Sequence, residues 1–210
     1  MIIPDETFVS FLTRNSYSDA AHDIGHIKRV VSAAIRLCET EKADVEIVRY
    51  AAWLHDCVSV PKDSPDRAKA SKLAAESGVA FLREQGYSDV EKLEQIFHCI
   101  EAHSFSGGIN PKTIEAGIVQ DADRLDALGA IGIARCLITG ATFGASLYHP
   151  DEPEPINRPA DEKSYITDHF YEKLLKLEHT MQTEAGREEA RRRTVFMREW
   201  LKQLYYEAGS

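Results

Sequence analysis

The sequence predicts an all-α protein, and three observations support that fold class. Apolar residues recur at three- and four-residue steps, most clearly over residues 27–38, which is the pattern of a helix with one buried face. The two clearest segments, 27–38 and 45–57, lack the alternation of apolar and polar residues that is typical of a strand. Helix-end signals separate the segments, with proline directly after Ser64 and Asn110 and glycine at position 86.

The same rules predict the elements in chain order. Helices are expected over residues 5–15, 27–38, 45–57, 64–85, 88–103, 111–128, 164–181 and 184–206. The Ser-x-x-Glu pattern at residues 88–91 predicts a capping box, and Gly78 is a candidate break in the fourth helix. Glycines 129, 132 and 140 indicate close packing or a break after Leu128. Four prolines predict a loop or lid over residues 148–161, and the basic run 191–193 predicts a solvated helix face.

Length and composition restrict the class of protein. One domain over residues 1–210 is expected, with C-terminal helices at about 164–206 packing on the rest of it. The net charge of -9 argues against a nucleic-acid polymer as partner. The sequence shows no signal peptide and no apolar run that approaches the roughly 20 residues of a membrane span. The four cysteines are spread widely and form no CxxC, so we expect reduced thiols in a cytoplasmic protein without a membrane partner.

The pair His55-Asp56 ends an apolar run and is the strongest candidate for a functional site. A carboxylate that is partly buried must be paired or must coordinate a metal, because its desolvation is too costly otherwise. An imidazole beside a carboxylate is a fragment of a divalent metal site. His26 upstream and Asp123 downstream are the best candidates for the missing ligands. Two imidazoles and two carboxylates suit a Mn, Mg, Fe, Co or Ni ion with water in the open positions.

These residues resemble the motifs of the HD superfamily of metal-dependent phosphohydrolases. The resemblance rests on the order of the four candidate ligands and on the stretches around them, which are His22-Asp23-Ile24-Gly25-His26, Trp53-Leu54-His55-Asp56-Cys57 and Asp121-Ala122-Asp123-Arg124-Leu125-Asp126-Ala127-Leu128-Gly129. It covers roughly residues 18–134. Residues 60–65, 103–107 and 129–135 are similar to a small stand-alone bacterial branch, the YedJ and YpgQ types.

The resemblance implies a single-domain HD-type helical bundle in which four side chains hold a divalent metal ion: His26, His55, Asp56 and Asp123. Asp123 is preferred to its neighbours because the last ligand of the family follows an alanine. Asp121 or Asp126 would then orient a ligand or cap a helix. Asp56 or Asp123 is expected to orient or deprotonate the attacking water.

Further histidines lie between the His-Asp pair and the last aspartate in members that bind two metals. His98 and His103 occupy this interval, about 140° apart around a helix. His103 is expected to act in catalysis through a substrate or second-metal contact, and His98 to be an exposed helix residue. Lys62 and Arg124 are expected to bind the phosphate of the substrate, although a salt bridge to a neighbouring aspartate is an equal alternative for Arg124.

The implied activity is metal-dependent hydrolysis of a small phosphorylated molecule, with a nucleotide favoured. Likeness to the YpgQ type favours nucleoside triphosphate pyrophosphohydrolysis; cyclic phosphodiesterase action, 5′-nucleotidase action and a homodimer stay open. Some nucleotidase branches carry an acidic residue about three positions after the His-Asp pair. Residues 57–59 are Cys-Val-Ser, which argues against that monophosphatase mechanism.

Two hypotheses belong to other classes of protein. The first is a di-iron oxygenase, for which only His22, His98 and His103 could supply further ligands. The second is a non-catalytic regulatory module in which the metal has a structural role.

Overall fold

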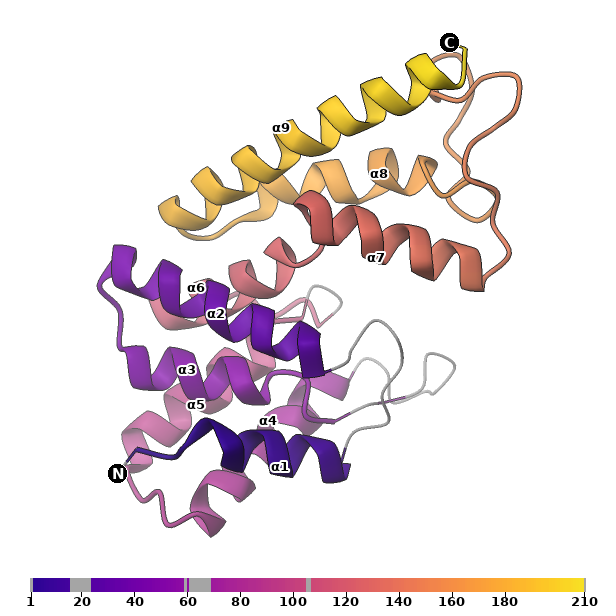
Figure 1. The fold of residues 1–210 in the computed structure, drawn as a ribbon. Coiled ribbons are helices and arrows are strands. Elements are labelled where there is room, and N and C mark those ends of the chain that lie inside the picture. The colour runs from indigo at the N-terminus through magenta and orange to yellow at the C-terminus, as the bar shows by residue number, and fades with distance from the viewer. Residues whose placement is uncertain (1, 16–23, 59, 61–68, 105–106, 210) are drawn as a thin grey trace. The chain divides into compact units, whose positions relative to one another are not determined.

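The computed structural model describes residues 2–15, 24–58, 60, 69–104 and 107–209. Every regular element in these ranges is a helix, apart from one isolated bridge between Ser146 and Tyr165 (Figure 1). The predicted all-α class is therefore confirmed. The chain divides into two compact units, Met1–Asp123 and Arg124–Ser210. The predicted extent of a single domain, residues 1–210, stays a prediction.

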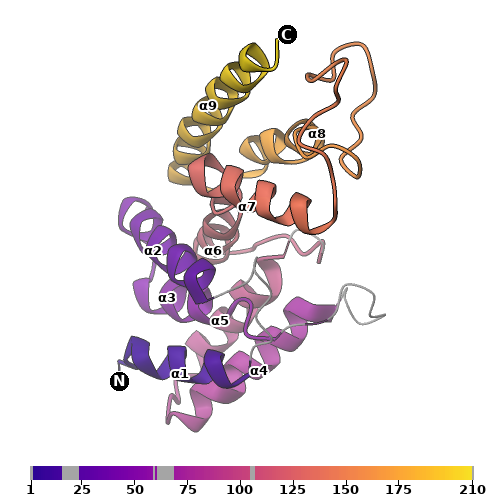
Figure 2. The same ribbon diagram turned by 45° about the vertical axis from the view of Figure 1, so that its right-hand side comes forward.

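The first unit is built around α3. It contains α1 (Asp5–Asn15), α2 (Ile24–Glu41), α3 (Val45–Leu54), α4 (Ala70–Glu84), α5 (Val90–Ala102) and most of α6 (Ile114–Leu125). The α3 helix packs against both α2 and α5, and α4 packs against α5 (Figure 2). Five consecutive residues of α3, from Tyr50 to Leu54, are buried. A helix buried on every side must be apolar all round, which explains the apolar run before His55-Asp56.

An aromatic cluster attaches α1 to this core. The ring centroid of Phe8 lies 5.4 Å from that of Tyr50, 5.8 Å from Trp53 and 5.6 Å from Phe81. The indole N–H of Trp53 donates to Asp5 at 2.8 Å. The predicted helix over residues 5–15 is confirmed, and its position follows from burial of Phe8.

The ends of α4 and α5 follow capping rules, with one correction. Gly86 has φ +83° and closes α4, because its N–H and that of Tyr87 donate to carbonyls in the last turn. The N-cap of α5 is Asp89, whose carboxylate accepts from the Lys92 N–H at 3.1 Å. The N-cap is therefore Asp89 instead of Ser88, and because the third helical residue is Lys92, no capping box forms.

Two other predicted helix limits differ from the structure, and a third lies outside the described residues. The α3 helix ends at Leu54 instead of residue 57, with His55 as its C-cap. The α4 helix starts at Ala70, while the predicted cap at residues 64–65 lies outside the described residues. The α6 helix starts at Ile114 because the Thr113 hydroxyl accepts from the Ala116 N–H at 3.2 Å, so the predicted start at residue 111 is wrong.

Gly78 does not break α4, which corrects another expectation. A Cβ atom at this position would lie 3.1 Å from Cβ of Leu54 and 3.2 Å from Cδ1 of Ile100. The missing side chain therefore allows α4 to approach α3 and α5 closely while the helix continues through it.

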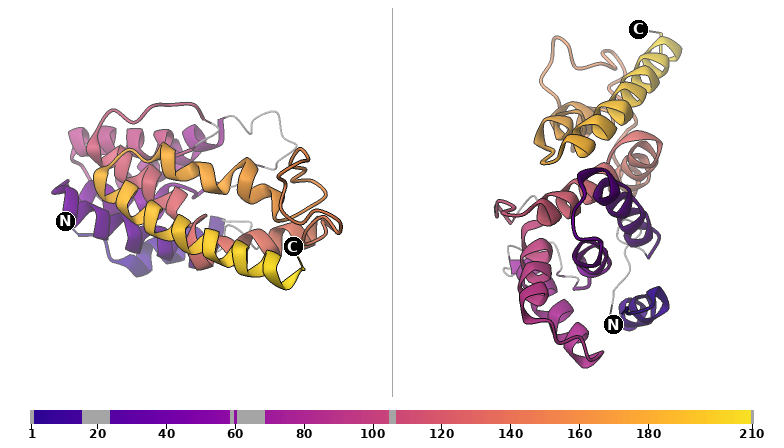
Figure 3. Two further views of the ribbon diagram at one scale, coloured as in Figure 1. Left: turned by 90° about the horizontal axis from the view of Figure 1, so that it is seen from above. Right: turned by 90° about the vertical axis from the view of Figure 1, so that its left-hand side faces the viewer.

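The second unit comprises α7 (Gly129–Thr142), α8 (Asp168–Glu172), the 3₁₀ helix η2 (Leu174–Thr180) and α9 (Glu184–Glu207). Both α7 and η2 pack against α9 (Figure 3). Gly129, with φ +71°, opens α7, a helix that the apolar pattern did not predict. The break expected after Leu128 begins earlier, because α6 ends at Leu125. The predicted helix over 184–206 is confirmed.

The single helix predicted over residues 164–181 is wrong. The N–H of Ser146 donates to the Ser164 carbonyl, and the N–H of Ile166 donates to the Ser146 carbonyl, both at 2.9 Å. These bonds replace helical bonds in that stretch. The backbone of Lys173 (φ −133°, ψ −59°) then separates α8 from η2.

The predicted loop over residues 148–161 contains no helix, and it is attached to α8. The guanidinium of Arg158 makes an ion pair with both carboxylate oxygens of the buried Asp168, with Nη2 at 2.9 Å from Oδ1. The Asp161 N–H donates to the same carboxylate at 2.7 Å. The loop is thus held by a buried charge pair within the second unit.

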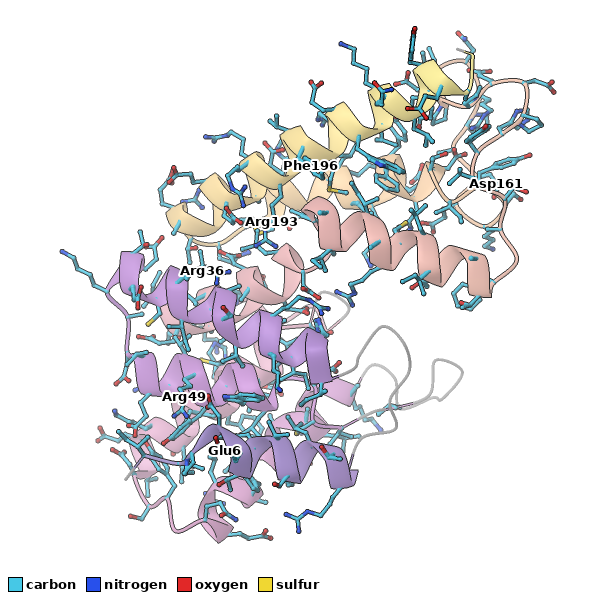
Figure 4. All side chains as sticks on the ribbon, viewed as in Figure 1. Glu6, Arg36, Arg49, Asp161, Arg193 and Phe196 are labelled. Atoms are coloured by element: carbon cyan, nitrogen blue, oxygen red, sulfur yellow. The ribbon has the colours of Figure 1, made fainter. Side chains whose placement is uncertain are left out.

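The prediction for the basic run 191–193 is wrong for one residue. Arg192 is exposed, but Arg193 is only 19% exposed and donates to the Leu125 carbonyl at 2.6 Å (Figure 4). Within the described ranges, no single helix is long and apolar enough to cross a membrane; the consecutive α6 and α7 reach that length and composition only together. All four cysteines carry free thiols.

Candidate metal centre

Two histidines occupy the C-caps of two helices in the first unit. His55 follows α3, and its Nδ1 lies 2.8 Å from the Ala52 carbonyl oxygen; His103 follows α5, and its Nδ1 lies 2.6 Å from the Ile100 carbonyl oxygen. A carbonyl oxygen can only accept, so Nδ1 carries the proton in both rings and Nε2 keeps its lone pair. The last carbonyls of a helix need such donors, which explains why each histidine bonds to the residue three positions earlier.

The two rings also bring two helix ends together. The centroids of His55 and His103 lie 5.0 Å apart, with the rings nearly perpendicular. Both are buried, with exposed fractions of 1% and 7%. The carboxyl end of a helix carries partial negative charge, so the meeting of α3 and α5 at this point favours a cation.

The structure gathers three of the four predicted ligands. His26 lies in the first turn of α2 and Asp123 near the end of α6. Nε2 of His26 lies 3.4 Å from Nε2 of His55 and 3.5 Å from Oδ1 of Asp123, and Nε2 of His55 lies 3.9 Å from that oxygen. No other group of three or more potential ligand side chains is this close among the residues that the structure describes.

The size of this group fits a divalent ion. A point equidistant from three atoms with these separations lies about 2.1 Å from each, the usual length of a bond from Zn²⁺ to nitrogen or Mg²⁺ to oxygen. His26 and His55 are buried, whereas the Asp123 side chain is 30% exposed. Solvent or a ligand could therefore reach the group on the aspartate side.

The protonation state of His55 also fits a metal ligand. Burial, together with the nearby rings of His103 and His26, lowers the pKa of His55 to about 4, against the opposing charges of Asp123 and Asp56. At neutral pH the ring is uncharged, which is the form that binds metals.

The carboxylate of Asp56 is not part of the three-residue group. Asp56 is half-buried and lies directly after the C-cap of α3, where its negative charge acts on His55. Its role as a ligand stays a prediction. Asp121 is fully buried, and Asp126 makes an ion pair with Arg135 at 2.6 Å within the second unit.

The remaining candidate site residues from the sequence are Lys62, His22, Arg124 and His98. Lys62 and His22 lie outside the described residues. Arg124 is half-buried, and its guanidinium donates to the Thr180 carbonyl in the second unit. Nε2 of His98 accepts from the Lys112 N–H at 2.9 Å, so His98 is half-buried and holds the segment before α6, contrary to the expected exposed residue.

Sequence reasoning missed one residue that helps to position the site, Gln120. The Gln120 side chain is buried and donates to the Ala102 carbonyl at 2.7 Å, which ties α6, one turn before Asp123, to the end of α5. The only sign of this role in the sequence is that Gln120 lies three residues before Asp123, on the same face of the predicted helix. Cys57, two residues after His55, is buried; burial raises the pKa of its thiol to about 12, and the thiol donates to the Ala74 carbonyl.

The fold and this group of side chains define a helical protein with a histidine and aspartate site for a divalent metal. Comparison with known proteins agrees: residues 22–128 match the HD domain family. The chain belongs to that family, as the sequence motifs predict, and HD domains bind divalent metal ions.

The relatives cover nearly the whole chain. The chain is 36% identical to YpgQ of Bacillus subtilis over 199 residues, which are 93% of this chain and 87% of that protein. The crystal structure of Bacillus subtilis YpgQ in complex with ADP matches with a TM-score of 0.71 at 32% identity, over 96% of this chain and 95% of that one. An HD-superfamily hydrolase from Bacillus thuringiensis matches with a TM-score of 0.72 at 33% identity, over 98% of both chains.

Proposed function

We propose that the protein is a metal-dependent phosphohydrolase that acts on a nucleotide, and that it converts nucleoside triphosphates into monophosphate and pyrophosphate. The observation that carries the proposal is the group of His26, His55 and Asp123, whose three ligand atoms lie within 4.8 Å of one another. Its spacing, the neutral state of His55 and the two helix ends support a site for a divalent cation.

In this proposal His26, His55, Asp56 and Asp123 hold the ion. A divalent ion, when bound, makes water a stronger nucleophile and polarises a phosphoryl oxygen. Asp56 and Asp123 accept hydrogen bonds from the attacking water and orient it, and either can take its proton. The 30% exposure of the Asp123 side chain supports access of water and substrate on that side.

His103 serves as the next polar group in the site. Because Nδ1 donates to Ile100, its Nε2 lone pair can accept a proton, and the protonated ring can donate to a phosphoryl oxygen. In this proposal Lys62 and Arg124 supply positive charge for the phosphates of the substrate.

One comparison supports a nucleotide as ligand, and another supports hydrolysis. YpgQ, which is 36% identical to this chain over 199 residues, has been crystallised with ADP. The Bacillus thuringiensis relative is described as an HD-superfamily hydrolase. Hydrolysis between the α- and β-phosphates is the reaction that we propose for this chain.

The test is a substrate screen on protein stripped with chelator and reloaded with Mn, Mg, Fe, Co or Ni. We expect nucleoside triphosphates to yield monophosphate and pyrophosphate, and His55→Ala and Asp56→Ala to lose turnover, while His98→Gln retains it. If triphosphates release orthophosphate, or if only cyclic nucleotides or only monophosphates are hydrolysed, the protein has a phosphohydrolase activity other than the proposed one. Absence of turnover with every metal, or full turnover in both alanine variants, would contradict the phosphohydrolase itself.

A further inference from the structure

The second unit contains a cavity of about 450 Å³ that involves none of the proposed metal ligands. Residues from the 148–161 loop, α8, η2 and α9 line it: Glu154, Tyr171, Leu175, Arg198, Leu201, Lys202, Tyr205 and Tyr206. This volume lies within the usual range for small-molecule sites, about 300–1,000 Å³. The lining combines apolar side chains, aromatic rings, two cationic side chains and one carboxylate.

One face of α9 supplies most of the cavity. Arg198, Leu201, Lys202 and Tyr205 follow one another at steps of three, one and three residues, so they share that face. Leu201 and Tyr205 are buried, with exposed fractions of 3% and 6%, and form the floor with Leu175. Tyr206 is 76% exposed and lies at the mouth.

The two cations at the mouth differ from three of the four other arginines of α9. Arg187, Arg192 and Arg193 make ion pairs with Glu184 or Glu189. In contrast, no ion pair or hydrogen bond joins the side chains of Arg198 and Lys202 to any residue in the described ranges. These two cations are four residues apart, and like charges at that spacing repel. An anion bound between them would relieve the repulsion.

Two half-buried polar residues, Glu154 and Tyr171, also line the cavity. The Tyr171 hydroxyl donates to Oε1 of Glu154 at 3.1 Å. The carboxylate of Glu154 can accept further hydrogen bonds from amino or hydroxyl groups of a ligand. The tyrosine rings offer flat faces on which a planar heterocycle can stack.

We propose that this cavity binds a nucleoside monophosphate, with the phosphate on Arg198 and Lys202 and the base against the tyrosine rings. The proposal stands on the second unit alone and does not depend on hydrolysis at the metal centre. Inorganic phosphate lacks the ring and adenosine lacks the charge, so a site built in this way should bind both less tightly than AMP.

The experiment is calorimetric titration of the full chain with AMP, in wild type, in the double variant Arg198→Ala/Lys202→Ala and in Tyr206→Ala. We expect the double variant to lose at least tenfold in affinity for one equivalent of AMP, because two charge-assisted contacts disappear. Tyr206→Ala should weaken that equivalent several-fold. Arg191→Ala, an exposed arginine of α9 that does not line the cavity, is the matched control and should bind like wild type.

Three results would overturn the proposal. The first is unchanged AMP binding in the double variant. The second is equal affinity for inorganic phosphate and AMP, which would mean that the rings take no part, and the third is equal affinity for adenosine and AMP, which would mean that the cations take no part. Turnover of triphosphates in the double variant, measured in parallel, separates this site from the proposed hydrolysis: the variant should lose AMP binding and retain the catalytic rate.

Discussion

At the scale of single residues, the candidate metal centre depends on which nitrogen of each histidine is free. His55 and His103 give their Nδ1 protons to carbonyls in the last turns of α3 and α5, so Nε2 is the atom available to a ligand. His98, also near the end of α5, uses its Nε2 to accept from Lys112 instead. His98 therefore has a different chemical role from His55 and His103, although the sequence alone does not distinguish them.

This difference predicts opposite effects of two matched substitutions. His55→Gln should lower the affinity for Mn²⁺ by tenfold or more, because the buried imidazole that faces His26 and Asp123 is lost. His98→Gln should retain Mn²⁺ and lose about 1 kcal/mol of unfolding free energy with the Lys112 bond. Metal content after dialysis and urea unfolding measure the two effects. Equal metal content in both variants would contradict this assignment.

The depressed pKa of His55 predicts a pH dependence of stability in metal-free protein. The pKa is about 4 in the folded state and about 6.5 in the unfolded state, so the unfolded state binds more protons between these values. The free energy of unfolding should therefore fall as pH drops below about 6.5, and this contribution should level off below about pH 4. Urea unfolding with chelator present measures it, and His55→Gln should show a shallower dependence. The same slope in both proteins would rule out the predicted pKa.

At the scale of elements, the limits of α5 and α7 depend on contacts that hydrophobic periodicity does not contain. The position of a cap depends on which side chain reaches the free N–H groups. The effect of a glycine depends on what lies beside its missing side chain. Both can be tested by single substitutions.

Two alanine substitutions at the start of α5 test which residue is the N-cap. Asp89→Ala should lower the free energy of unfolding by about 1 kcal/mol, because the Lys92 N–H loses its acceptor. Ser88→Ala should change it by less than about 0.5 kcal/mol. Chemical denaturation of the two variants decides between the caps, and a larger loss for Ser88→Ala would restore the capping box centred on that residue.

The substitution Gly132→Ala tests whether a side chain at this position stabilises or destabilises the protein. Helix propensity alone predicts that Gly132→Ala stabilises α7 by up to about 1 kcal/mol. In the structure, a Cβ atom at this position would lie 2.2 Å from the Ala127 carbonyl oxygen, so the backbone must move. We expect a loss of about 1–3 kcal/mol instead. A rise in the thermal midpoint of this variant would show that the turn before α7 adapts without cost.

At the scale of the whole molecule, each compact unit contains one of the two tryptophans, Trp53 and Trp200. All three residues of the metal group lie in the first unit. Trp53 is buried beside Phe8, and Trp200 stacks on Phe170 with the ring centroids 5.6 Å apart. Single-tryptophan variants can therefore report on the two units separately.

We expect Mn²⁺ to stabilise the first unit more than the second. At a concentration one hundred times its dissociation constant, a ligand adds about 2.7 kcal/mol to the state that binds it. Fluorescence of Trp200→Phe, which keeps Trp53, should show the larger rise in thermal midpoint, and that of Trp53→Phe the smaller one. Equal shifts would mean that the two units unfold as a single cooperative body.

Much of the fold was predictable from local patterns. Apolar spacing alone located α1, α2 and α9, because one face of each helix is buried and the period of burial is visible in the sequence. It did not locate the ends of α3 and α6, which depend on single hydrogen bonds at His55 and Thr113. It also failed over residues 164–181, where pairing with Ser146 replaces a helix.

The sequence by itself determined the family, the all-helical class and the candidate ligands, because their order and neighbours form a motif that needs no coordinates. Only the tertiary structure decided which of those ligands meet. His26 lies in α2, His55 caps α3 and Asp123 lies in α6, and their ligand atoms come within 4.8 Å of one another in the first unit. Distances between helices depend on the side chains that fill the space between them, such as Gln120, and a one-dimensional pattern does not contain these distances.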